Sequence, residues 1–500
     1  MTLLATIFVK SIPFRAAYII SGLAFLFFAR SDYQWKWSPY YFVQYSTVPV
    51  GTYIWVNSSF HQLGFNFNSS HPQAQNLIEE MKAKWVLPYK LYRNNHQGQA
   101  PRRVLILGAG LGNDVNIALM NGAREIVAVE IDPVILGLGE KLNTAKPYQN
   151  PRVTAVVDDA RHFLATTNEK YDLIVFGTID SQALLSGYAN LRLENFVYTR
   201  ESLADAKRLL NDTGMAVIHY AVLKPWLYSR IYSTFREAFG DQSRLFFEKN
   251  IFLFNATIVG AKGIPTFHDA PVIVENFGDG IVSADDWPFI YMERPTIAPI
   301  YLKIFAIILA LIAAAFILLR KTSPARGMFP NFLLLGAGFT LMESSAVVRL
   351  ALVFGSTWIV NAVVFSAILT TIFIGNLLVL YKKAPPLRAA WPLLFAAILI
   401  NYFFPLHFLF QMGPALRVIS AGALIGLPFL FASLCFSHLF QRETVTGFPL
   451  GVNMVGAMAG GLIEYLSMLT GLQAVWLIAL CIYLAAWLAS PRLDANQAVE

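Results

Sequence analysis

The residues best suited to chemistry in this sequence are a glycine loop and a carboxylate that follows it. Gly108, Gly110 and Gly112 have the spacing G-x-G-x-G, and the third glycine of the dinucleotide pattern is replaced by Asn113. Glu130 follows about twenty residues later, where a carboxylate can accept hydrogen bonds from both hydroxyls of a ribose. We interpret the loop and Glu130 as a site for an adenosyl-sulfonium donor. The loop alone is equally compatible with a structural turn.

Two further carboxylates follow apolar runs in the same region. Asp159 comes after the run Val153–Val157, and Asp180 comes after the run that begins at Tyr171. The carboxyl ends of parallel strands form the ligand edge of an open sheet, so both acids are expected in one crevice. Asp159 can accept from an adenine amino group or cap the helix that follows it. Asp180 can take the proton of an attacking amine, or it can cap a turn.

These residues can meet only if the strands before them lie in one parallel sheet. The runs Val104–Leu107 and Ile126–Val129 flank the glycine loop and a helix-like segment. This order is typical of the nucleotide-binding half of a doubly wound, Rossmann-like α/β domain. Residues 40–70 alternate apolar and polar residues, which predicts a small antiparallel β unit before that domain. We expect Glu130 at an exposed strand tip, where it contributes hydrogen bonds rather than packing.

The second half of the chain is too apolar for a soluble protein. Hydrophobic residues make up 56% of the 500 residues, and most of the excess lies after about residue 297. The predicted membrane spans are 297–319, 331–354, 357–381, 389–410, 415–440, 446–469 and 471–490. A shorter apolar run at 16–29 predicts either an N-terminal membrane helix or an interfacial anchor. The net charge of +7 is assigned to the loops, so no nucleic-acid partner is expected.

These patterns predict a multi-pass protein of the cell membrane, of the bacterial inner-membrane type, with the lipid bilayer as a partner. The expected organisation is an N-terminal anchor (1–39), a small β unit with a linking helix (40–95), the Rossmann-like domain (96–293), a seven-helix transmembrane bundle (294–492) and a tail (493–500). Basic loop residues favour a domain outside the cytoplasm. An adenosyl-sulfonium donor favours the cytosol, where such compounds are made. The side that the domain faces therefore stays open.

Polar residues inside the predicted spans have two interpretations. Glu343, Arg349 and Glu464 lie at membrane depth, where ionisable groups tend to face a bundle interior or a cavity. They can form a structural polar clamp or a path for a substrate or proton. The two cysteines, Cys435 and Cys481, lie in apolar runs and are read as small hydrophobic residues. No metal site is expected.

The order of the motifs resembles the spermidine synthase family of aminopropyltransferases, and more narrowly its bacterial membrane-fused branch. The matching stretches are His61-Gln62, the loop Gly108–Gly112, Val129–Pro133 as V-E-I-D-P, Asp159-Ala160, Asp180, Val197–Glu201 as L-Y-T-x-E, and Asp285–Phe289 as D-D-W-P-F. The resemblance implies that Gln62, the loop glycines, Glu130, Asp159 and Ala160 bind the donor. It also implies that Asp180 deprotonates the amine, and that His61, Glu79 and Tyr198 lie on the substrate side.

The sequence departs from the family pattern on the side that holds cationic groups. Leu111 stands where the family's glycine loop has the aspartate that holds the donor's ammonium. Gly177 stands where the D-S-S-D-P signature has its first acid. The stretch Ile78–Met81 reads I-E-E-M where the family has Y-H-E-M, so Glu79 replaces the histidine. The adenosine half of the site is retained, and the half for cationic substrates is reduced.

The resemblance implies transfer of an aminopropyl group from decarboxylated S-adenosylmethionine to a small amine such as putrescine, by an enzyme that can be a homo-oligomer. The substituted acids keep a second hypothesis open, a methyltransferase that uses S-adenosylmethionine on a membrane-presented substrate. The acids within the spans keep a third open, a non-catalytic sensor or transport accessory domain on a helical bundle.

Overall fold

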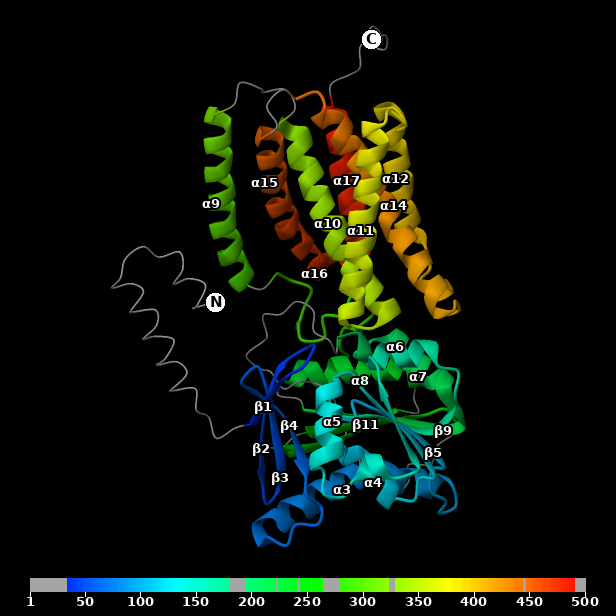
Figure 1. The fold of residues 1–500 in the computed structure, drawn as a ribbon. Helices are drawn as coiled ribbons and strands as arrows, with labels where there is room; N and C mark the ends of the chain where they lie inside the picture. Colours follow the sequence, from blue (N-terminus) through cyan, green and yellow to red (C-terminus); the bar gives the residue numbers. More distant parts are fainter. Residues whose placement is uncertain are drawn as a thin grey trace, which may run out of the picture.

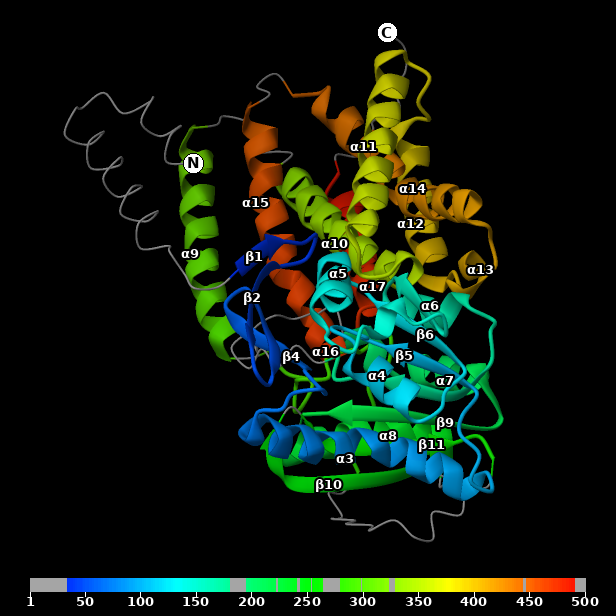
Figure 2. The same ribbon diagram turned by 60° about the horizontal axis from the view of Figure 1, so that its bottom comes forward.

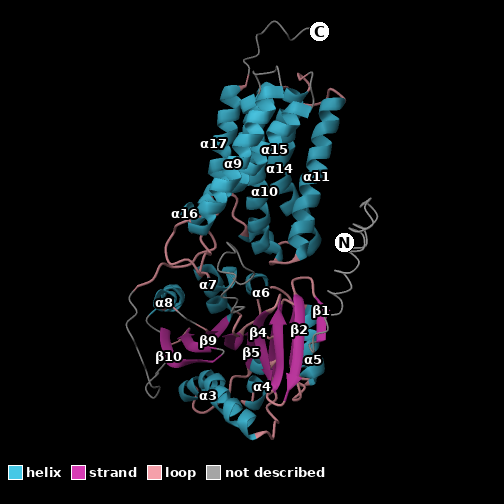
Figure 3. Ribbon diagram, turned by 90° about the vertical axis from the view of Figure 1, so that its left-hand side faces the viewer, coloured by secondary structure: helices cyan, strands magenta, loops and turns pink. Residues whose placement is uncertain are grey.

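The computed structural model describes residues 34–179, 195–221, 224–240, 243–252, 254–263, 279–297, 299–322, 329–443 and 447–490. The predicted anchor run at 16–29, the tail and Asp180 lie outside these residues. Figure 1 shows an α/β domain with a bundle of helices above it. Figure 3, turned by 90°, keeps the same separation between the strands and the bundle.

A four-stranded antiparallel sheet precedes the main domain. Its strands, in the spatial order β1-β2-β3-β4, are β1 (Gln34–Trp37), β2 (Phe42–Val48), β3 (Gly51–Val56) and β4 (Ser59–Phe65). The sheet therefore begins at Gln34, ahead of the expected boundary at residue 40. Buried positions alternate with partly exposed ones along β2, as the sequence pattern predicted. Helix α3 (Pro72–Asn95) then leads to the main sheet.

The main sheet has seven strands in the order β10-β11-β9-β8-β5-β6-β7. Their bounds are β5 (Arg103–Leu107), β6 (Glu125–Glu130), β7 (Val153–Val157), β8 (Tyr171–Phe176), β9 (Leu210–Tyr220), β10 (Ser243–Phe252) and β11 (Phe254–Ala261). Strands β5 to β9 pair in parallel, and β10 and β11 add an antiparallel edge. The predicted Rossmann-like fold is confirmed. The strand order reverses beside β5, which puts the glycine loop at the switch point.

Helices cover the main sheet on both sides, and each fills the segment between two strands. They are α4 (Asn113–Met120), α5 (Pro133–Leu142), α6 (Ala160–Thr166), α7 (Arg200–Leu209) and α8 (Pro225–Phe239), with the short helix η3 (Asn195–Tyr198) before α7. The buried residues of β5 divide between two clusters, since Val104 and Ile106 join one and Leu105 and Leu107 the other. This division is expected for a strand buried on both faces.

The C-terminal region is helical throughout its described parts. Its main helices are α9 (Pro299–Thr322), α10 (Phe329–Phe354), α11 (Trp358–Leu380), α12 (Leu387–Phe403), α14 (Pro414–Phe440), α15 (Gly447–Ile463) and α17 (Ala474–Ala489), with the short α13 (His407–Phe410) and α16 (Ser467–Thr470). Four stretches are long and apolar enough to cross a membrane: Pro330–Phe354, Trp358–Leu380, Pro414–Phe440 and Gly447–Thr470. The predicted span 389–410 is interrupted, because α12 ends at Phe403 and Pro405 follows.

Two glycines let α15 approach α10 closely. A Cβ on Gly456 would lie 2.0 Å from the carbonyl oxygen of Leu333, and one on Gly460 would lie 2.4 Å from that of Ala337. Any larger residue would push the two backbones apart, which explains the G-x-x-x-G spacing seen in the sequence.

The bundle rests on the α/β domain through specific polar contacts. In Figure 2 the lower ends of α10 and α11 lie beside α6. The backbone N–H of Ser356, in the α10–α11 loop, donates to Asp159 at 3.2 Å, and the indole N–H of Trp287 donates to the carbonyl of Met468 at 2.9 Å. Asp286 accepts from the N–H of Gln473 at 2.6 Å, next to the start of α17.

Candidate active site

The glycine loop connects β5 to α4 in a conformation that favours glycine. Gly108, Gly110 and Gly112 have φ angles of 71°, 52° and 91°, in the left-handed region. The N–H groups of Gly108 and Ala109 donate to the carbonyl of Val129 at 2.9 and 3.0 Å, so the loop is tied to the end of β6. Gly112 directly precedes α4 and does not line the cleft described below.

Glu130, the last residue of β6, is buried and holds the loop. Its Oε2 accepts from the N–H of Gly110 at 2.8 Å, and its Oε1 accepts from the N–H of Asp132 at 3.0 Å. Only 8% of its surface is exposed, so the expectation of an exposed strand tip was wrong. Burial raises the pKa of Glu130 to about 7, although the two N–H groups favour its charged form.

Strand β4 of the small sheet forms the opposite wall. Gln62 accepts from the N–H of Leu111 through its Oε1 at 3.0 Å. A Cβ on Gly110 would lie 2.3 Å from the same oxygen, so only glycine lets the loop approach this side chain. Burial lowers the pKa of His61 to about 4, which leaves its ring neutral at pH 7.

Asp159 joins the site to α6 and to the bundle. Its Oδ1 accepts from the N–H of His162 at 2.9 Å and so caps α6, while its Oδ2 accepts from the N–H of Ser356. Only 3% of the residue is exposed, and burial raises its pKa. The neighbouring Asp158 contacts Nδ1 of His162 at 2.8 Å, and Nε2 of that ring lies 3.2 Å from an Nη of Arg417 in α14.

These elements surround one cleft, which we call the glycine-loop cleft. It is lined by Tyr41, His61, Gln62, Gly108, Gly110, Val129, Glu130, Ile131, Ile135, Asp158, Asp159, Ala160, Thr178, Ile179 and Val197. Its volume is about 90 Å³. Ile179 lies across the loop, since a Cβ on Gly108 would be 2.6 Å from its Cγ1. The volume of the cleft is smaller than the roughly 300 Å³ or more that is typical of sites for small molecules.

Besides Gly112, three other residues expected at the site are absent from the cleft lining. Glu79 lies on an exposed face of α3 and pairs with Lys82 at 3.2 Å. Tyr198 is buried behind the cleft, with its ring edge-on to Tyr220 at 5.1 Å. Asp180 lies outside the described residues, directly after Ile179.

The structure shows the surroundings of Leu111 and Gly177, the two positions where the family pattern has an acid. Asp114 is an acid that lies near the second of them. Leu111 is 2% exposed, packs in an apolar cluster with Val43, Ile54 and Ile135, and is not among the residues that line the cleft. Asp114 was not singled out from the sequence. It lies in the first turn of α4, 3.5 Å from where a Cβ on Gly177 would be, and burial raises its pKa to about 7. Its position shortly after the glycine loop was the signal that could have identified it.

The glycine loop lies at the switch point of a doubly wound sheet. Glu130 ends the next strand, β6, and Asp159 follows β7. Together they define a Rossmann-like domain with an acidic cleft at the carboxyl edge of its sheet. Comparison with known proteins shows a likeness to one family. Residues 93–253 match the family model described as spermine/spermidine synthase domain. Over this stretch, about a third of its length, the chain is similar to the spermine/spermidine synthase family.

Several curated relatives are named polyamine aminopropyltransferase. The protein of that name from Korarchaeum cryptofilum is 28% identical over 144 residues, which are 28% of this chain and 42% of the relative. Polyamine aminopropyltransferase 1 from Pseudomonas aeruginosa is 30% identical over 126 residues, 24% of this chain and 40% of the relative. The matched region thus spans less than half of either relative. A solved structure of a probable spermidine synthase from Corynebacterium glutamicum has 16% identity and a TM-score of 0.37, over 48% of this chain and 84% of that chain.

Proposed function

We propose that this chain is a membrane-bound aminopropyltransferase that moves the aminopropyl group of decarboxylated S-adenosylmethionine to a small amine such as putrescine. The observation that carries the proposal is the placement of Glu130, a buried carboxylate that holds the glycine loop and faces the cleft. The match of residues 93–253 to the spermine/spermidine synthase domain supports the choice of donor.

In the proposed reaction the amine nitrogen attacks the carbon next to the donor's sulfonium. The new C–N bond forms as the C–S bond breaks, methylthioadenosine leaves, and the nitrogen gives up a proton. Glu130 would accept from the ribose hydroxyls and Asp159 from the adenine amino group, with Gln62 and Ala160 beside them. The protein mainly aligns the reactants, because a sulfonium is already a good leaving group. Asp180 is the proposed base.

Neutral side chains around the cleft suit a cationic donor. The ring of His61 stays uncharged at pH 7, so it adds no positive charge next to the sulfonium. Glu130, Asp158 and Asp159 supply carboxylates on the opposite side. An electron-poor transition state at the transferred carbon is favoured by such acidic surroundings.

The departure at Leu111 favours a second candidate function. Intact S-adenosylmethionine carries a carboxylate that the decarboxylated donor lacks, and an aspartate at this position would repel it. Leu111 is apolar and packs in a buried cluster outside the cleft lining, so this chain has no carboxylate at that position to repel the intact donor. A methyltransferase acting on a membrane-presented acceptor is therefore the alternative.

A thermal-shift experiment on the purified full-length protein separates these functions. The protein is heated with decarboxylated or intact S-adenosylmethionine, each with and without putrescine, and methylthioadenosine release is measured in parallel. A larger shift with the decarboxylated donor, and release that depends on the diamine, would support the aminopropyltransferase. A larger shift with intact S-adenosylmethionine would favour the methyltransferase. Without a shift from either donor, the transferase proposal fails and a sensor or accessory role gains support.

The membrane placement needs its own test. The α10–α11 loop and the start of α14 contact the α/β domain. The other ends of α11 and α14 therefore lie about a membrane's thickness from the domain. These far ends carry Lys382, Lys383 and Arg442. The positive-inside rule puts these far ends in the cytoplasm, whereas the cytosolic donor requires the domain there. Alkaline phosphatase and green fluorescent protein fusions after Lys383 and Arg442 decide between them. Phosphatase activity at both sites supports the cytosolic transferase, and fluorescence at both contradicts it.

A further inference from the structure

A second cavity lies between the α/β domain and the bundle, and we call it the interface cavity. Its volume is about 600 Å³, within the range of sites that hold small molecules. Helices α6 and α7 and the segment around Asp285 form its floor, and the ends of α10, α12 and α17 with the α12–α14 connection form its roof. It is distinct from the glycine-loop cleft, although Ala160 and Val197 line the cleft while their neighbours Arg161 and Phe196 line the cavity.

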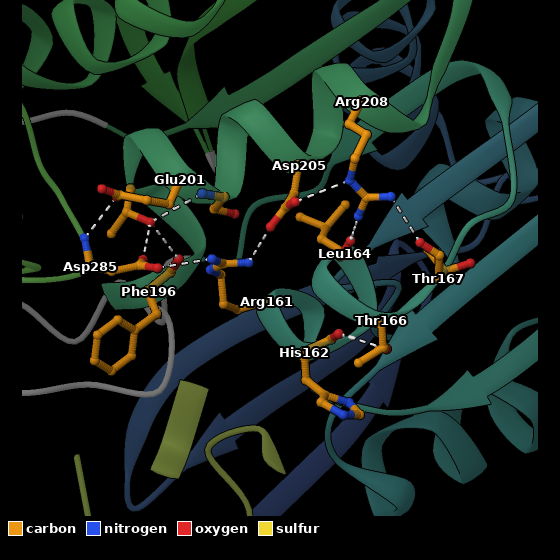
Figure 4. Close-up of polar contacts among 12 residues, drawn as sticks. Arg161, His162, Leu164, Thr166, Thr167, Phe196, Glu201, Asp205, Arg208 and Asp285 are labelled. Carbon is orange, nitrogen blue, oxygen red and sulfur yellow. Dashed lines mark hydrogen bonds and ion pairs between the residues drawn. The ribbon is translucent and has the colours of Figure 1, made fainter. Parts of the chain in front are cut away.

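The floor is a network of ion pairs whose charges balance. Arg161 lies between Asp205 and Asp285, at 2.7 and 2.9 Å, as Figure 4 shows. Arg208 approaches Asp205 from the other side at 3.2 Å and also donates to the carbonyl of Leu164 at 2.8 Å. Two guanidinium groups therefore face two carboxylates, and a third lining carboxylate, Glu201, pairs with Arg200 at 2.8 Å, so these groups offer a ligand no net charge.

Two other lining residues have charges that the described residues leave uncompensated. Arg349, in α10, donates to the carbonyl oxygens of Asn401 and Phe404, and no described carboxylate forms an ion pair with it. Asp286 accepts from the N–H of Gln473, and it makes no ion pair with any cation in the described part of the chain. The cavity thus has one fixed positive charge on its roof and one fixed negative charge on the domain side. A ligand that carries both charges fits it better than a simple anion or cation.

The rest of the roof combines apolar and aromatic residues with the polar Ser345, His407, Gln411 and Gln473. Leu352 at the end of α10, Phe404 and Phe410 in the α12–α14 connection and Trp476 at the start of α17 line the cavity. They belong to the helix ends nearest the domain. If the bundle crosses a bilayer, this is the level of the lipid head groups, where aromatic residues gather. A ligand at this level comes from the bilayer more readily than from water.

We propose that the interface cavity binds a phospholipid with a primary-amine head group. Its phosphate contacts Arg349, its ammonium contacts Asp286, and the upper part of its acyl chains packs on Leu352, Phe404, Phe410 and Trp476. A charge-assisted contact at each end of the head group gives both affinity and orientation. The inference rests on the membrane placement proposed above and not on the transfer reaction, so it stands or falls by lipid binding.

Native mass spectrometry of the delipidated full-length protein in detergent tests the proposal. The protein is titrated with phosphatidylethanolamine, phosphatidylcholine and phosphatidylglycerol of identical acyl chains. We expect phosphatidylethanolamine to bind about tenfold more tightly than either other lipid, because only it offers both a phosphate and a hydrogen-bonding ammonium. R349Q should weaken phosphatidylethanolamine and phosphatidylglycerol alike by about tenfold. D286N should lessen the difference between those two lipids, and an asparagine still accepts the Gln473 N–H.

A matched variant and melting curves make the titration specific to the interface cavity. R442Q changes an arginine at the far end of α14 and should leave all three affinities unchanged. Melting curves of each variant exclude loss of folding. Equal binding of the three lipids, or unchanged binding in R349Q, would overturn the proposal. Competition by water-soluble glycerophosphoethanolamine as strong as that by the full lipid would also overturn it, since the bilayer would then not be the source.

Discussion

Replacing Glu130 by glutamine tests the donor site most directly. The two side chains have nearly the same size, so packing is conserved. Each carboxylate oxygen of Glu130 accepts one backbone N–H, from Gly110 at 2.8 Å and from Asp132 at 3.0 Å. Glutamine has only one carbonyl oxygen, and its NH₂ group would face the second N–H. One buried donor is then unsatisfied, which should cost about 1–3 kcal/mol of folding stability.

In Glu130→Gln the donor affinity should fall because the variant lacks the negative charge of the carboxylate. A hydrogen bond to a charged group contributes about 1.5–3 kcal/mol, and the proposal gives Glu130 two ribose hydroxyls. The glutamine oxygen stays occupied by one backbone N–H, so both hydroxyls lose a charged acceptor. Allowing for partial compensation by water, we expect a loss of about 2–4 kcal/mol, or about 30- to 1000-fold in Kd.

The same carboxylate predicts a pH dependence. Because the pKa of Glu130 is about 7 in the unliganded protein, hydroxyl donation to it requires loss of a proton. Its contribution to donor affinity should rise up to about tenfold per pH unit below 7 and level off above. For folding the sign is opposite. The folded pKa lies above the ordinary value of 4.5, so the protonated form stabilises the fold below that value, and this stability is lost as pH rises to about 7.

Isothermal titration of the full-length protein with decarboxylated S-adenosylmethionine at pH 6, 7 and 8 measures both effects. E125Q is the matched control, because Glu125 begins the same strand, is exposed and pairs with Arg103 at 2.9 Å. It should bind like the parent protein. If folded E130Q binds the donor within about threefold of the parent, or keeps the same pH slope, then Glu130 only holds the loop and the ribose assignment is wrong.

Three other substitutions test separate parts of the site. Asp180→Asn should slow methylthioadenosine release by about 100- to 10,000-fold with little change in donor Kd, and near-full turnover would make Asp180 a turn residue. Leu111→Asp should lower the free energy of unfolding by about 3 kcal/mol or more in a denaturant titration, because it puts a charge in an apolar cluster. A stable variant that binds the donor more tightly would instead put residue 111 in the cleft. Arg417→Gln removes the contact with His162 and should weaken donor binding about three- to tenfold, measured by titration, with Arg417→Lys restoring part of it. An unchanged Kd would show that this contact does not influence Asp158.

The sequence was most informative where neighbouring residues determine structure. Strand β5, the glycine loop, α4 and β6 follow one another within 30 residues, and each has a strong local pattern. The position of Glu130 and Asp159 directly at or after strand-like runs likewise predicted that both lie at one edge of the sheet. The local pattern failed for the burial of Glu130, because two backbone N–H groups that a sequence does not reveal draw the carboxylate inward. Neither could it show that Leu111 packs under the small sheet, since that depends on β4, nearly 50 residues earlier.

Long-range contacts with the bundle were the least predictable part. Ser356 is 197 residues from Asp159, and no periodicity or motif relates the two positions. The break of the predicted span 389–410 lies at Pro405, whereas Pro392 in the same run is accommodated inside α12. The first contact depends on a backbone group whose position is fixed only when the bundle has packed on the domain, and the break in the span depends on which of two prolines ends the helix.

Asp159 links these two parts of the molecule. One of its oxygens caps α6 and the other accepts from Ser356, yet a carboxylate has about four lone-pair sites, so an adenine amino group can still be accommodated. If Asp159 binds the donor as proposed, movement of the α10–α11 loop alters how this carboxylate is solvated and oriented, and hence its affinity for the donor. By linkage, donor binding must then favour the loop position that suits it, by the same free energy. Since α10 also carries Arg349 in the interface cavity, the lipid proposed there and the donor act near the same end of one helix, and each is expected to influence the binding of the other.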